Sequence, residues 1–385
     1  MAVPKLRFTG FDGDYLELSY DKFAPLQRGF DLPVSTIVEG DYPVVFSNGI
    51  LKKHNEFKAQ APGVVTGRSG TIGNITWVEK DYWPHNTSLW VTNFFDNEPK
   101  YVFYFLQKFD VSRFASGSGV PTLNRNDVHA QLITISPERR EQTKIASFLS
   151  AVDEKISQLT QKHQLLSQYK QGMMQKLFSQ QLRFKADDGS EFGEWEEKIL
   201  KDLFPKIRNG FVGVATPYYV NYGVKYLQGK NIKNGKIDAT GLIFINQEFH
   251  QKKTNSILKT NDILMVQSGH VGECAVVTED YDNANCHALL VLSPKSSKLI
   301  NSKFVVYYFY SEIGKKKIAL IKTGNTIEHI LASDIKEVAL LFPCLAEQTK
   351  IANFLSAIDQ KIEVVVQQIE QAKQWKKGLL QQMFV

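Results

Sequence analysis

The sequence EQTKIASFLSAVDEKI at residues 141–156 recurs as EQTKIANFLSAIDQKI at residues 347–362. The similarity continues without gaps over residues 141–178 and 347–384, where about half of the positions are identical. An internal repeat is considered first because its period decides the architecture. This repeat predicts one structural element used twice, with the same task in both copies.

Both copies carry an apolar stripe whose members are alternately four and three residues apart, the spacing of a coiled-coil seam. The members are Ile145, Leu149, Val152, Ile156, Leu159, Leu166, Met173 and Leu177, then Ile351, Leu355, Ile358, Ile362, Val365, Ile369, Ala372, Leu379 and Met383. His163, Lys170 and Lys376 interrupt the stripe, and such interruptions often fix the register. We expect two helices of about 57 Å that pair, because neither can bury its stripe alone.

An antiparallel pairing is favoured by connectivity, since the segment 181–346 can leave the end of one helix and return to the start of the other. The tripeptide LRF occurs at residues 6–8 and again at 182–184, just after the first helix. If the chain termini meet, the N-terminal LRF takes the same place at the end of the second helix. The two halves would then be related by a pseudo-two-fold axis.

A weaker repeat links RSGTIGNITWVEKDY at residues 68–82 with QSGHVGECAVVTEDY at residues 267–281. Each SGxxG predicts a strand followed by a tight glycine turn, where a backbone can approach a ligand closely. One copy alone would be read as an ordinary hairpin turn. Its presence in both halves favours a shared role, in folding or in binding.

The segments around the helices predict a mixed α/β fold. Strand-like runs are GVVTGRSG, DILMVQSG, ALLVLS and VALLFP, and one apolar helix is expected near 100–108 and another near 303–312. The fold class is therefore α+β, with two mixed α/β domains separated by a long antiparallel two-helix coiled coil. The expected boundaries are 1–140 for the first domain, 141–180 for the first helix, 181–346 for the second domain and 347–385 for the second helix.

Composition narrows the class of protein. The 385 residues suffice for two domains, and 43% hydrophobic with 22% charged residues is typical of a soluble protein. No apolar run approaches the length of a membrane span, and the N-terminus lacks the apolar core of a signal peptide. Three cysteines without a CxxC favour a reducing cytoplasm. The net charge of +6 is compatible with a polyanionic partner.

Catalytic motifs were sought and are absent from the sequence. There is no (N/D)PP(Y/F/W) tetrapeptide to hold a target amine, no GxxxxGK[ST] phosphate loop, no GxGxxG after a strand and no GxSxG elbow. We therefore expect a non-catalytic chain without catalytic residues.

Four potential zinc ligands occur close together: His270, Cys274, Cys286 and His287. The repeat argues against a zinc site, because the matching positions in the first half are Thr71, Ile75, Thr87 and Ser88. We expect buried thiols, a surface histidine and no bound metal.

The outer faces of both helices are rich in glutamine, a low-charge surface that suits coverage by another protein. These glutamines are Gln158, Gln161, Gln164, Gln168, Gln171 and Gln175, then Gln367, Gln368, Gln371, Gln374, Gln381 and Gln382. An ordinary solvated face remains an alternative. The identical starts of the helices would present the same patch twice, as two identical partner subunits require. The candidate partner-binding residues are Glu141, Gln142, Lys144, Glu347, Gln348 and Lys350.

Two domains of different sequence, held apart by a pair of long helices, could bind two unlike half-sites of a duplex polymer. For DNA, half-sites on one face lie at multiples of about 34–36 Å. Side chains able to contact bases or phosphates are present in both halves. The candidate DNA-binding residues are Arg68, Ser69, Lys80, His85, Asn86, Asn124, Arg125, Lys230, Asn231, Lys233, Asn234, Gln267, Ser268 and His270.

Together these features resemble the specificity (S) subunit of type I restriction–modification systems. The resemblance rests on the duplicated EQTKIA(S/N)FLSA(V/I)D(E/Q)KI, the paired SGxxG turns, SGSGVPTLNRNDV at 116–128 and YLQGKNIKNGKID at 226–238. It covers essentially the whole chain. The first half departs from the pattern, because it has only YPVVFSNGILKKHNEF where the second has YLQGKNIKNGKID.

The resemblance implies that residues 1–140 and 181–346 are target recognition domains, each reading one half of a bipartite double-stranded DNA site. The helices would set the half-site spacing and recruit two copies of a methyltransferase subunit. That subunit would bind S-adenosylmethionine and methylate a flipped adenine. Two restriction subunits, using ATP and Mg²⁺, would add translocation and cleavage where the system has them. The chain itself would bind no cofactor and stay in the cytoplasm.

Two alternatives belong to other classes. A coiled-coil adaptor between protein-binding domains would show no salt-dependent DNA binding in its complex. A divergent stand-alone methyltransferase would bind S-adenosylmethionine as an isolated chain, although the missing proline pair argues against it.

Overall fold

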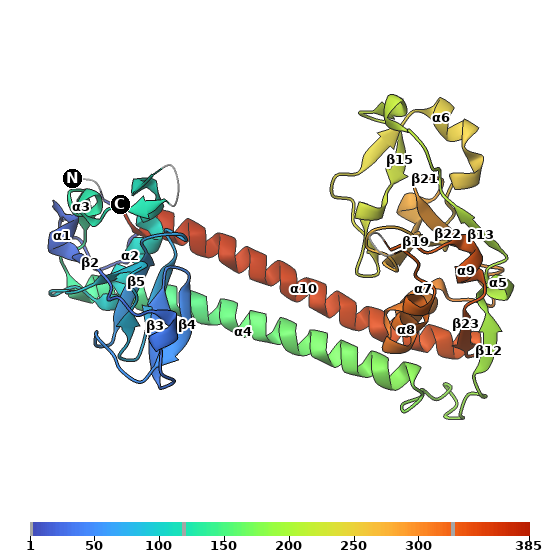
Figure 1. Ribbon diagram of the computed structural model, residues 1–385, viewed down its shortest axis with the longest axis horizontal. Helices are drawn as coiled ribbons and strands as arrows, with labels where there is room; N and C mark the ends of the chain where they lie inside the picture. Colours follow the sequence, from blue (N-terminus) through green and yellow to red (C-terminus); the bar gives the residue numbers. More distant parts are fainter. Residues whose placement is uncertain (1–2, 118–120, 325–327) are drawn as a thin grey trace. The chain divides into compact units, whose positions relative to one another are not determined.

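The computed structural model describes residues 3–117, 121–324 and 328–385. Residues 118–120, part of the stretch SGSGVPTLNRNDV, thus lie outside the described residues. The chain forms two compact units: unit 1 comprises Met1–Lys162 and Val365–Val385, and unit 2 comprises His163–Val364. Both ends of the chain therefore belong to unit 1 (Figure 1). Within the described ranges, no helix combines the length and apolarity needed to cross a membrane.

Unit 1 is built on a four-stranded antiparallel sheet with the order β2-β8-β5-β6. A three-stranded sheet, β4-β3-β7, and a two-stranded pair, β1-β11, complete it. The strands are β1 Leu16–Ser19, β2 Leu26–Arg28, β3 Tyr42–Phe46, β4 Gly49–His54, β5 Gly63–Gly67, β6 Ile75–Val78, β7 Trp83–Pro84, β8 Ser88–Val91 and β11 Leu132–Ile135. Helix α2 (Pro99–Phe109) packs against β5 and β6, and this explains why β5 is buried throughout (Figure 1).

Unit 2 repeats this pattern of sheets with different sequences. Its main sheet has the order β13-β22-β19-β20, and β12-β23 form the two-stranded pair. The strands are β12 Glu196–Ile199, β13 Lys206–Asn209, β14 Tyr219–Val220, β15 Val224–Leu227, β16 Ile232–Lys233, β17 Lys236–Ile237, β18 Ile243–Ile245, β19 Ile263–Val266, β20 Cys274–Val276, β21 Asn285–Cys286, β22 Leu289–Ser293 and β23 Ala339–Phe342. The second sheet is β14-β18-β15-β21.

Shorter elements surround the sheets. They are α1 Tyr20–Phe23, β9 Ala115–Ser116, β10 Thr122–Leu123 and α3 Arg125–His129 in unit 1, and α5 Leu200–Leu203, α6 Gln247–Lys252, α7 Ser302–Tyr310, α8 Glu312–Leu320 and α9 Ala332–Lys336 in unit 2. Helices α7 and α8 pack together in unit 2 (Figure 1). The aromatic helices α2 and α7 correspond to the two apolar helices expected from the sequence.

The segment that departed from the repeat in the sequence has a counterpart in the topology. Strand β3 pairs antiparallel with β4 and parallel with β7. In unit 2, β15 likewise pairs antiparallel with β18 and parallel with β21. The additional hairpin β16–β17 follows β15. Thus YPVVFSNGILKKHNEF and YLQGKNIKNGKID enter comparable sheets, and the second adds a hairpin.

The long helices α4 (Arg139–Phe178) and α10 (Leu345–Met383) contribute to both units. In unit 1, Leu149 of α4 and Leu379 of α10 lie in the main hydrophobic core. In unit 2, Leu177 of α4 and Leu355 of α10 lie in the corresponding core. Burial of these stripes supplies the apolar contacts that neither helix could make alone.

Two of the polar residues that interrupt the stripes are engaged in ion pairs. In unit 1, Lys376 Nζ of α10 lies 2.7 Å from Asp153 Oδ1 of α4. In unit 2, Lys170 Nζ of α4 lies 2.6 Å from Asp359 Oδ1 of α10. Each pair joins a residue in one half of a long helix to a residue in the opposite half of the other.

The two LRF tripeptides dock in the same way at the ends of the long helices. In unit 1, Leu6 N donates to Gln382 O at 2.9 Å. In unit 2, Leu182 N donates to Lys176 O at 3.1 Å. The N-terminal tripeptide therefore takes the place at the end of α10 that the sequence predicted for it.

Candidate nucleic-acid interface

Both SGxxG segments form the expected turns at the ends of buried strands. The first follows β5 and the second follows β19. In each turn both glycines have a positive φ: 81° for Gly70, 86° for Gly73, 81° for Gly269 and 94° for Gly272. Only glycine adopts this region readily, because it has no Cβ. The spacing of the glycines is therefore a backbone requirement of the turn.

Each turn is bonded to a second segment far along the chain. In unit 1, Leu123 N donates to Arg68 O at 2.8 Å, and Ser69 forms a β-bridge with Thr122. In unit 2, Ile330 N donates to Gln267 O at 3.0 Å, and Ser268 bridges to His329. We name residues 68–73 with 121–125 turn site 1, and residues 267–272 with 328–332 turn site 2.

Three of the residues predicted in unit 1 lie together. Arg68, Asn124 and Arg125 line a pocket of about 630 Å³, named here the arginine pocket. Its other lining residues are Gln27, Arg28, Gly29, Phe30, Asp31, Leu89, Thr122 and Leu123. The sequence reasoning missed Arg28 and Asp31, whose only local signal is their position at the end of a short strand.

Three other predicted residues of unit 1 serve different roles or lie elsewhere. His85 is half-buried, and its ring nitrogens contact Thr87 Oγ1 at 2.9 Å and Leu32 O at 3.2 Å. Burial lowers the pKa of His85, so its ring is neutral and committed to the fold. Asn86 donates to the carboxylate of Asp31. Lys80 follows β6, at the end of the β5–β6 hairpin opposite turn site 1.

The prediction that Asn231 contacts DNA is wrong for a physical reason. Its side chain is fully buried, accepts from Gln228 N at 3.0 Å and donates to Asp238 O at 2.9 Å. These bonds close the loop before β16, so the amide is not available to a base. Its neighbours Lys230 and Lys233 are exposed, and Lys233 pairs with Asp238 at 3.2 Å.

The β16–β17 hairpin adjoins turn site 2. Glu273 follows the turn, and its Oε2 accepts from Asn234 N at 2.7 Å and from Tyr310 Oη at 2.7 Å. Asn234 is exposed at the tip of the hairpin, and His270 is exposed in the turn. The structure thus brings together two predicted groups that are well separated in the sequence.

Helix α8 adds cations that the sequence reasoning did not select. A Cβ at Gly272 would lie 3.0 Å from Ile318 Cγ2, so α8 packs directly against turn site 2. The same helix carries Lys315, Lys316 and Lys317, and none of them joins an ion pair within the described part of the chain. The run KKK was the available signal, and lysines beside turn site 2 have the charge to contact phosphates.

The four potential zinc ligands do not converge. Cys274 and Cys286 are fully buried, and burial raises the pKa of the Cys286 thiol to about 12. Cys286 contacts Ser256 O at 3.7 Å, while His287 shares a hydrogen bond with Tyr226 Oη at 3.1 Å. In the three described ranges, no group of three or more His, Cys, Asp or Glu side chains could hold a metal ion.

Two of the predicted partner-binding residues are buried carboxylates. Glu141 accepts from Arg7 Nε at 2.7 Å in unit 1. Glu347 accepts from Arg183 Nη2 at 2.8 Å and from Trp195 Nε1 at 3.0 Å in unit 2. Both glutamates have no exposed surface. Their assignment to a partner contact is therefore corrected: they anchor the segments around the two LRF tripeptides.

The two adjoining glutamines are corrected in the same way. Gln142 and Gln348 are each 1% exposed. Gln142 Oε1 accepts from Glu98 N at 2.8 Å, and Gln348 Oε1 accepts from Asn301 N at 2.9 Å. Each glutamine therefore binds the backbone at the start of an aromatic helix, α2 or α7. Their repetition reflects this shared fold contact.

The remaining two predicted partner-binding residues reach the surface. Lys144 is exposed, with its ammonium 5.0 Å from the centre of the Phe8 ring. Lys350 is half-buried and lies 2.7 Å from Asp187. A partner contact at the start of the long helices can therefore involve only these lysines among the six predicted residues.

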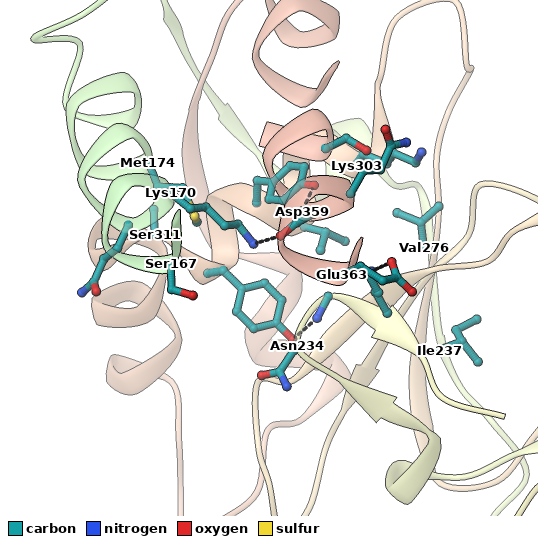
Figure 2. Close-up of a pocket in the computed structure, with 18 of the residues that line it drawn as sticks. Ser167, Lys170, Met174, Asn234, Ile237, Val276, Lys303, Ser311, Asp359 and Glu363 are labelled. Carbon is teal, nitrogen blue, oxygen red and sulfur yellow. Dashed lines mark hydrogen bonds and ion pairs between the residues drawn. The ribbon is translucent and has the colours of Figure 1, made fainter. Parts of the chain in front are cut away.

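A hollow of about 830 Å³ lies within unit 2 among α4, α10, α7 and the β16–β17 hairpin (Figure 2). Two of its carboxylates are neutralised, since Asp359 pairs with Lys170 and Glu363 pairs with Lys236, both at 2.6 Å. The ion pairs tie the helices to each other and to the hairpin. These ion pairs give the hollow a structural role.

Comparisons with known proteins were made for the whole chain. The family model of the type I restriction modification DNA specificity domain matches residues 34–168 and 193–374. Two type I restriction enzyme specificity subunits of Methanocaldococcus jannaschii, MjaVIII and the putative MjaX, are 27% and 29% identical to 73% and 74% of this chain. The matches span 68% and 66% of those relatives, so the chain covers about two thirds of their length.

Solved structures show the same fold. The crystal structure of the type I S subunit from M. genitalium aligns with a TM-score of 0.65 at 15% identity, covering 100% of this chain and 99% of that one. A chain from work on complex assembly and conformational transition of the type I R-M system aligns with a TM-score of 0.58 at 14% identity. That alignment covers 97% of this chain and 98% of the other.

Proposed function

The chain belongs to the family of type I restriction–modification DNA specificity proteins, and from this premise we propose that it is the non-catalytic subunit that specifies the DNA sequence for a methyltransferase complex. The observation that carries the proposal is the pair of turn sites. Both have the same backbone construction, yet Arg68 stands in one where Gln267 stands in the other. A shared framework with different side chains suits two readers of unlike half-sites.

We assign residues 1–140 and 181–346 as the two target recognition domains, with spacer helices at 141–180 and 347–385. The helices form an antiparallel coiled coil, and the chain is an internal repeat about a pseudo-two-fold axis. Support comes from the matching ion pairs Lys376–Asp153 and Lys170–Asp359, which lie in different units. Polar pairs at core-type positions favour one register over others.

Each domain contacts one half of a bipartite site in double-stranded DNA. Arginine and lysine side chains position the backbone through phosphates, and side chains at the turn sites read base edges. Lys315–Lys317 suit the phosphate role in unit 2, whereas the arginine pocket suits base readout in unit 1. The spacer helices fix the length of the unread gap.

Two copies of a methyltransferase subunit bind the spacer helices, one at each repeated start. Exposed glutamines along α4 and α10 provide a polar surface of low charge for these contacts. S-adenosylmethionine belongs to the methyltransferase subunits, which methylate adenine, and this chain binds no cofactor. Restriction subunits, using ATP and Mg²⁺, complete the nuclease where it exists. The complex works in the cytoplasm, where chromosomal DNA is available.

The direct test is to co-express the chain with a methyltransferase subunit from the same system in a methylation-free host. Long-read sequencing then maps modified adenines, with a strain lacking this chain as the control. We expect two short specific blocks around a fixed gap, with one modified adenine on each strand. A stable complex that leaves the genome unmodified would instead favour a coiled-coil adaptor without DNA specificity.

A further inference from the structure

The arginine pocket is lined by three arginines and one aspartate. Arg28, Arg68 and Arg125 come from β2, from turn site 1 and from the start of α3, and Asp31 follows β2. A carboxylate among the arginines weakens the attraction of the pocket for a phosphate, because it repels the anion. The presence of an acceptor among donors therefore favours a ligand that offers both hydrogen-bond acceptors and a donor.

Asp31 is held in place while part of it stays accessible. Arg28 Nη2 donates to Asp31 Oδ1 at 2.7 Å and Arg28 Nη1 to Asp31 Oδ2 at 3.4 Å, and Asn86 Nδ2 also donates to Oδ1. The Asp31 side chain nevertheless remains 65% exposed. The hydrogen bond from Asn86, and then the one from Arg28, lower the pKa of Asp31. At neutral pH it is therefore an ionised acceptor with lone pairs to spare.

Arg68 and Arg125 are fixed at the backbone and free at the guanidinium. Arg68 N donates to Thr87 O at 2.9 Å, while its carbonyl accepts from Leu123 N. Arg125 opens α3, behind Asn124, whose side chain accepts from Asn126 N at 3.1 Å. Neither guanidinium donates a hydrogen bond to another residue in the described ranges. Their guanidinium groups are therefore available to a ligand.

The corresponding place in unit 2 has a different chemistry. Gln267 stands in turn site 2 where Arg68 stands in turn site 1. Leu123 and Ile330 make the same backbone bond to these residues, so Ala332, two residues after Ile330, corresponds to Arg125, two residues after Leu123. Neither Gln267 nor Ala332 can present a guanidinium fork. The two arginines therefore have no arginine counterpart at the matching, described positions of unit 2, as a determinant of one half-site requires.

We propose that the arginine pocket reads a G·C base pair in the first half of the DNA site, with Arg68 or Arg125 donating to guanine and Asp31 accepting from cytosine. A guanine presents O6 and N7 as paired acceptors, which a guanidinium contacts with two hydrogen bonds. The cytosine of the same pair presents its N4 amine as a donor. No other base pair offers this combination to an arginine beside a carboxylate. The assignment rests on the proposed function.

The test compares methylation maps of complexes carrying Arg68→Lys, Arg125→Lys or Asp31→Ala with the wild-type map. Lysine keeps the positive charge for phosphates but lacks the planar fork that binds guanine in two places. We expect at least one of the arginine variants to lose discrimination at one G·C position of the first block, by roughly 5- to 150-fold. Asp31→Ala should relax the same position, and the second block should stay unchanged.

Lys5→Ala is the matched control, because it removes one charge from unit 1 at an exposed residue outside turn site 1 and the arginine pocket. It should leave the motif intact. Recovery of the methyltransferase complex with each variant separates altered reading from misfolding. Wild-type motifs in all three pocket variants, or a uniform loss of methylation with an unchanged motif, would overturn the assignment. A wild-type complex that methylates without a split motif would overturn the proposed function itself.

Discussion

Lys170 and Asp359 form an ion pair of 2.6 Å between α4 and α10, and Tyr307 of α7 donates a hydrogen bond to the same carboxylate at 2.7 Å. The pair is about one-fifth exposed. It joins the two long helices of unit 2 to each other and to the sheet domain. Figure 2 shows Lys170 and Asp359 pointing toward one another among the residues that line the hollow of unit 2.

Unit 1 contains the same arrangement with the helices exchanged. Tyr104 of α2 donates to Asp153 at 2.8 Å, and Lys376 of α10 pairs with Asp153 at 2.7 Å. The offset between Asp153 and Asp359 is 206 residues, since 359 − 153 = 206, and 376 − 170 gives the same value for the lysines. Each long helix therefore contributes one lysine and one aspartate, and together they form two equivalent ion pairs between the helices.

Replacing Asp359 with alanine should destabilise unit 2. The substitution removes the partner of Lys170 and the carboxylate that accepts from Tyr307. A partly buried polar network of this kind is worth about 1–3 kcal/mol. The measurement is the free energy of unfolding from urea titration. Glu370→Ala is the control, because its pair with Lys373 is more than half exposed and worth less than about 1 kcal/mol. Equal losses in both variants would refute the special role of Asp359.

Arg183→Ala should destabilise the chain more strongly than a surface substitution. It leaves the carboxylate of Glu347, which has no exposed surface, with Trp195 as its remaining hydrogen-bond donor. Removing one partner of a buried ion pair typically costs about 3–5 kcal/mol. Adding Glu347→Gln should restore part of the loss, because the neutral amide needs no counter-charge. A double variant as unstable as Arg183→Ala alone would contradict this explanation.

The stability of unit 1 should fall below neutral pH through His129. Its Nε2 accepts a hydrogen bond from Leu26 N at 2.8 Å, which requires an unprotonated nitrogen. Burial, followed by the charge of Arg125, lowers the pKa of His129. The unfolded chain takes up the proton near pH 6.5, so the contribution is complete above that pH and is lost as pH falls through the lower folded-state pKa.

The measurement is the unfolding free energy of unit 1 between pH 8 and pH 5, with His129→Gln as the comparison. Glutamine can still accept from Leu26 N but does not titrate, so the variant should lose less stability on acidification. The slope should not vanish, because burial also lowers the pKa of His85. If the unfolding free energy of the variant and of the wild type falls equally with pH, His129 does not contribute to the pH dependence.

We expect the methyltransferase subunit to contact Lys144 and Lys350, the two lysines that reach the surface at the starts of the long helices. We expect combined Lys144→Glu and Lys350→Glu substitutions to weaken recovery of the methyltransferase subunit. Each single substitution should reduce the number of bound subunits from two toward one, as native mass spectrometry can count. Lys361→Glu, an exposed charge in mid-helix, is the comparison. Full binding by the double variant would exclude both lysines from the interface.

The sequence predicted the long helices because a stripe with alternating steps of four and three leaves few alternatives. It also predicted the LRF contacts, since one tripeptide immediately follows the first helix. Detail within the stripe was less accurate: Met174 is buried whereas Met173 is only half-buried. A regular spacing does not show where a helix stops packing against the other helix and begins to pack against the sheet domain.

The repeated dipeptide Glu-Gln, at 141–142 and 347–348, was predicted to contact a partner because its true contacts are distant in sequence. Arg7 lies 134 residues from Glu141, and Arg183 lies 164 residues from Glu347. No local pattern reveals such a pair, so a repeated polar dipeptide suggested a repeated surface. The arginine pocket was only half predicted for the same reason, because the sheet order, and not neighbouring sequence, brings Asp31 and Arg68 to the same pocket.

The central claim, that each domain reads one half of the site, is tested most directly by exchanging residues 181–346 for the same region of a relative. Arg183 and Trp195 should be retained, so that Glu347 keeps its donors. The readout is the methylation map of the hybrid complex beside that of the wild type. We predict that the block read by unit 1 and the gap stay the same while the other block changes. A change in both blocks would contradict the account.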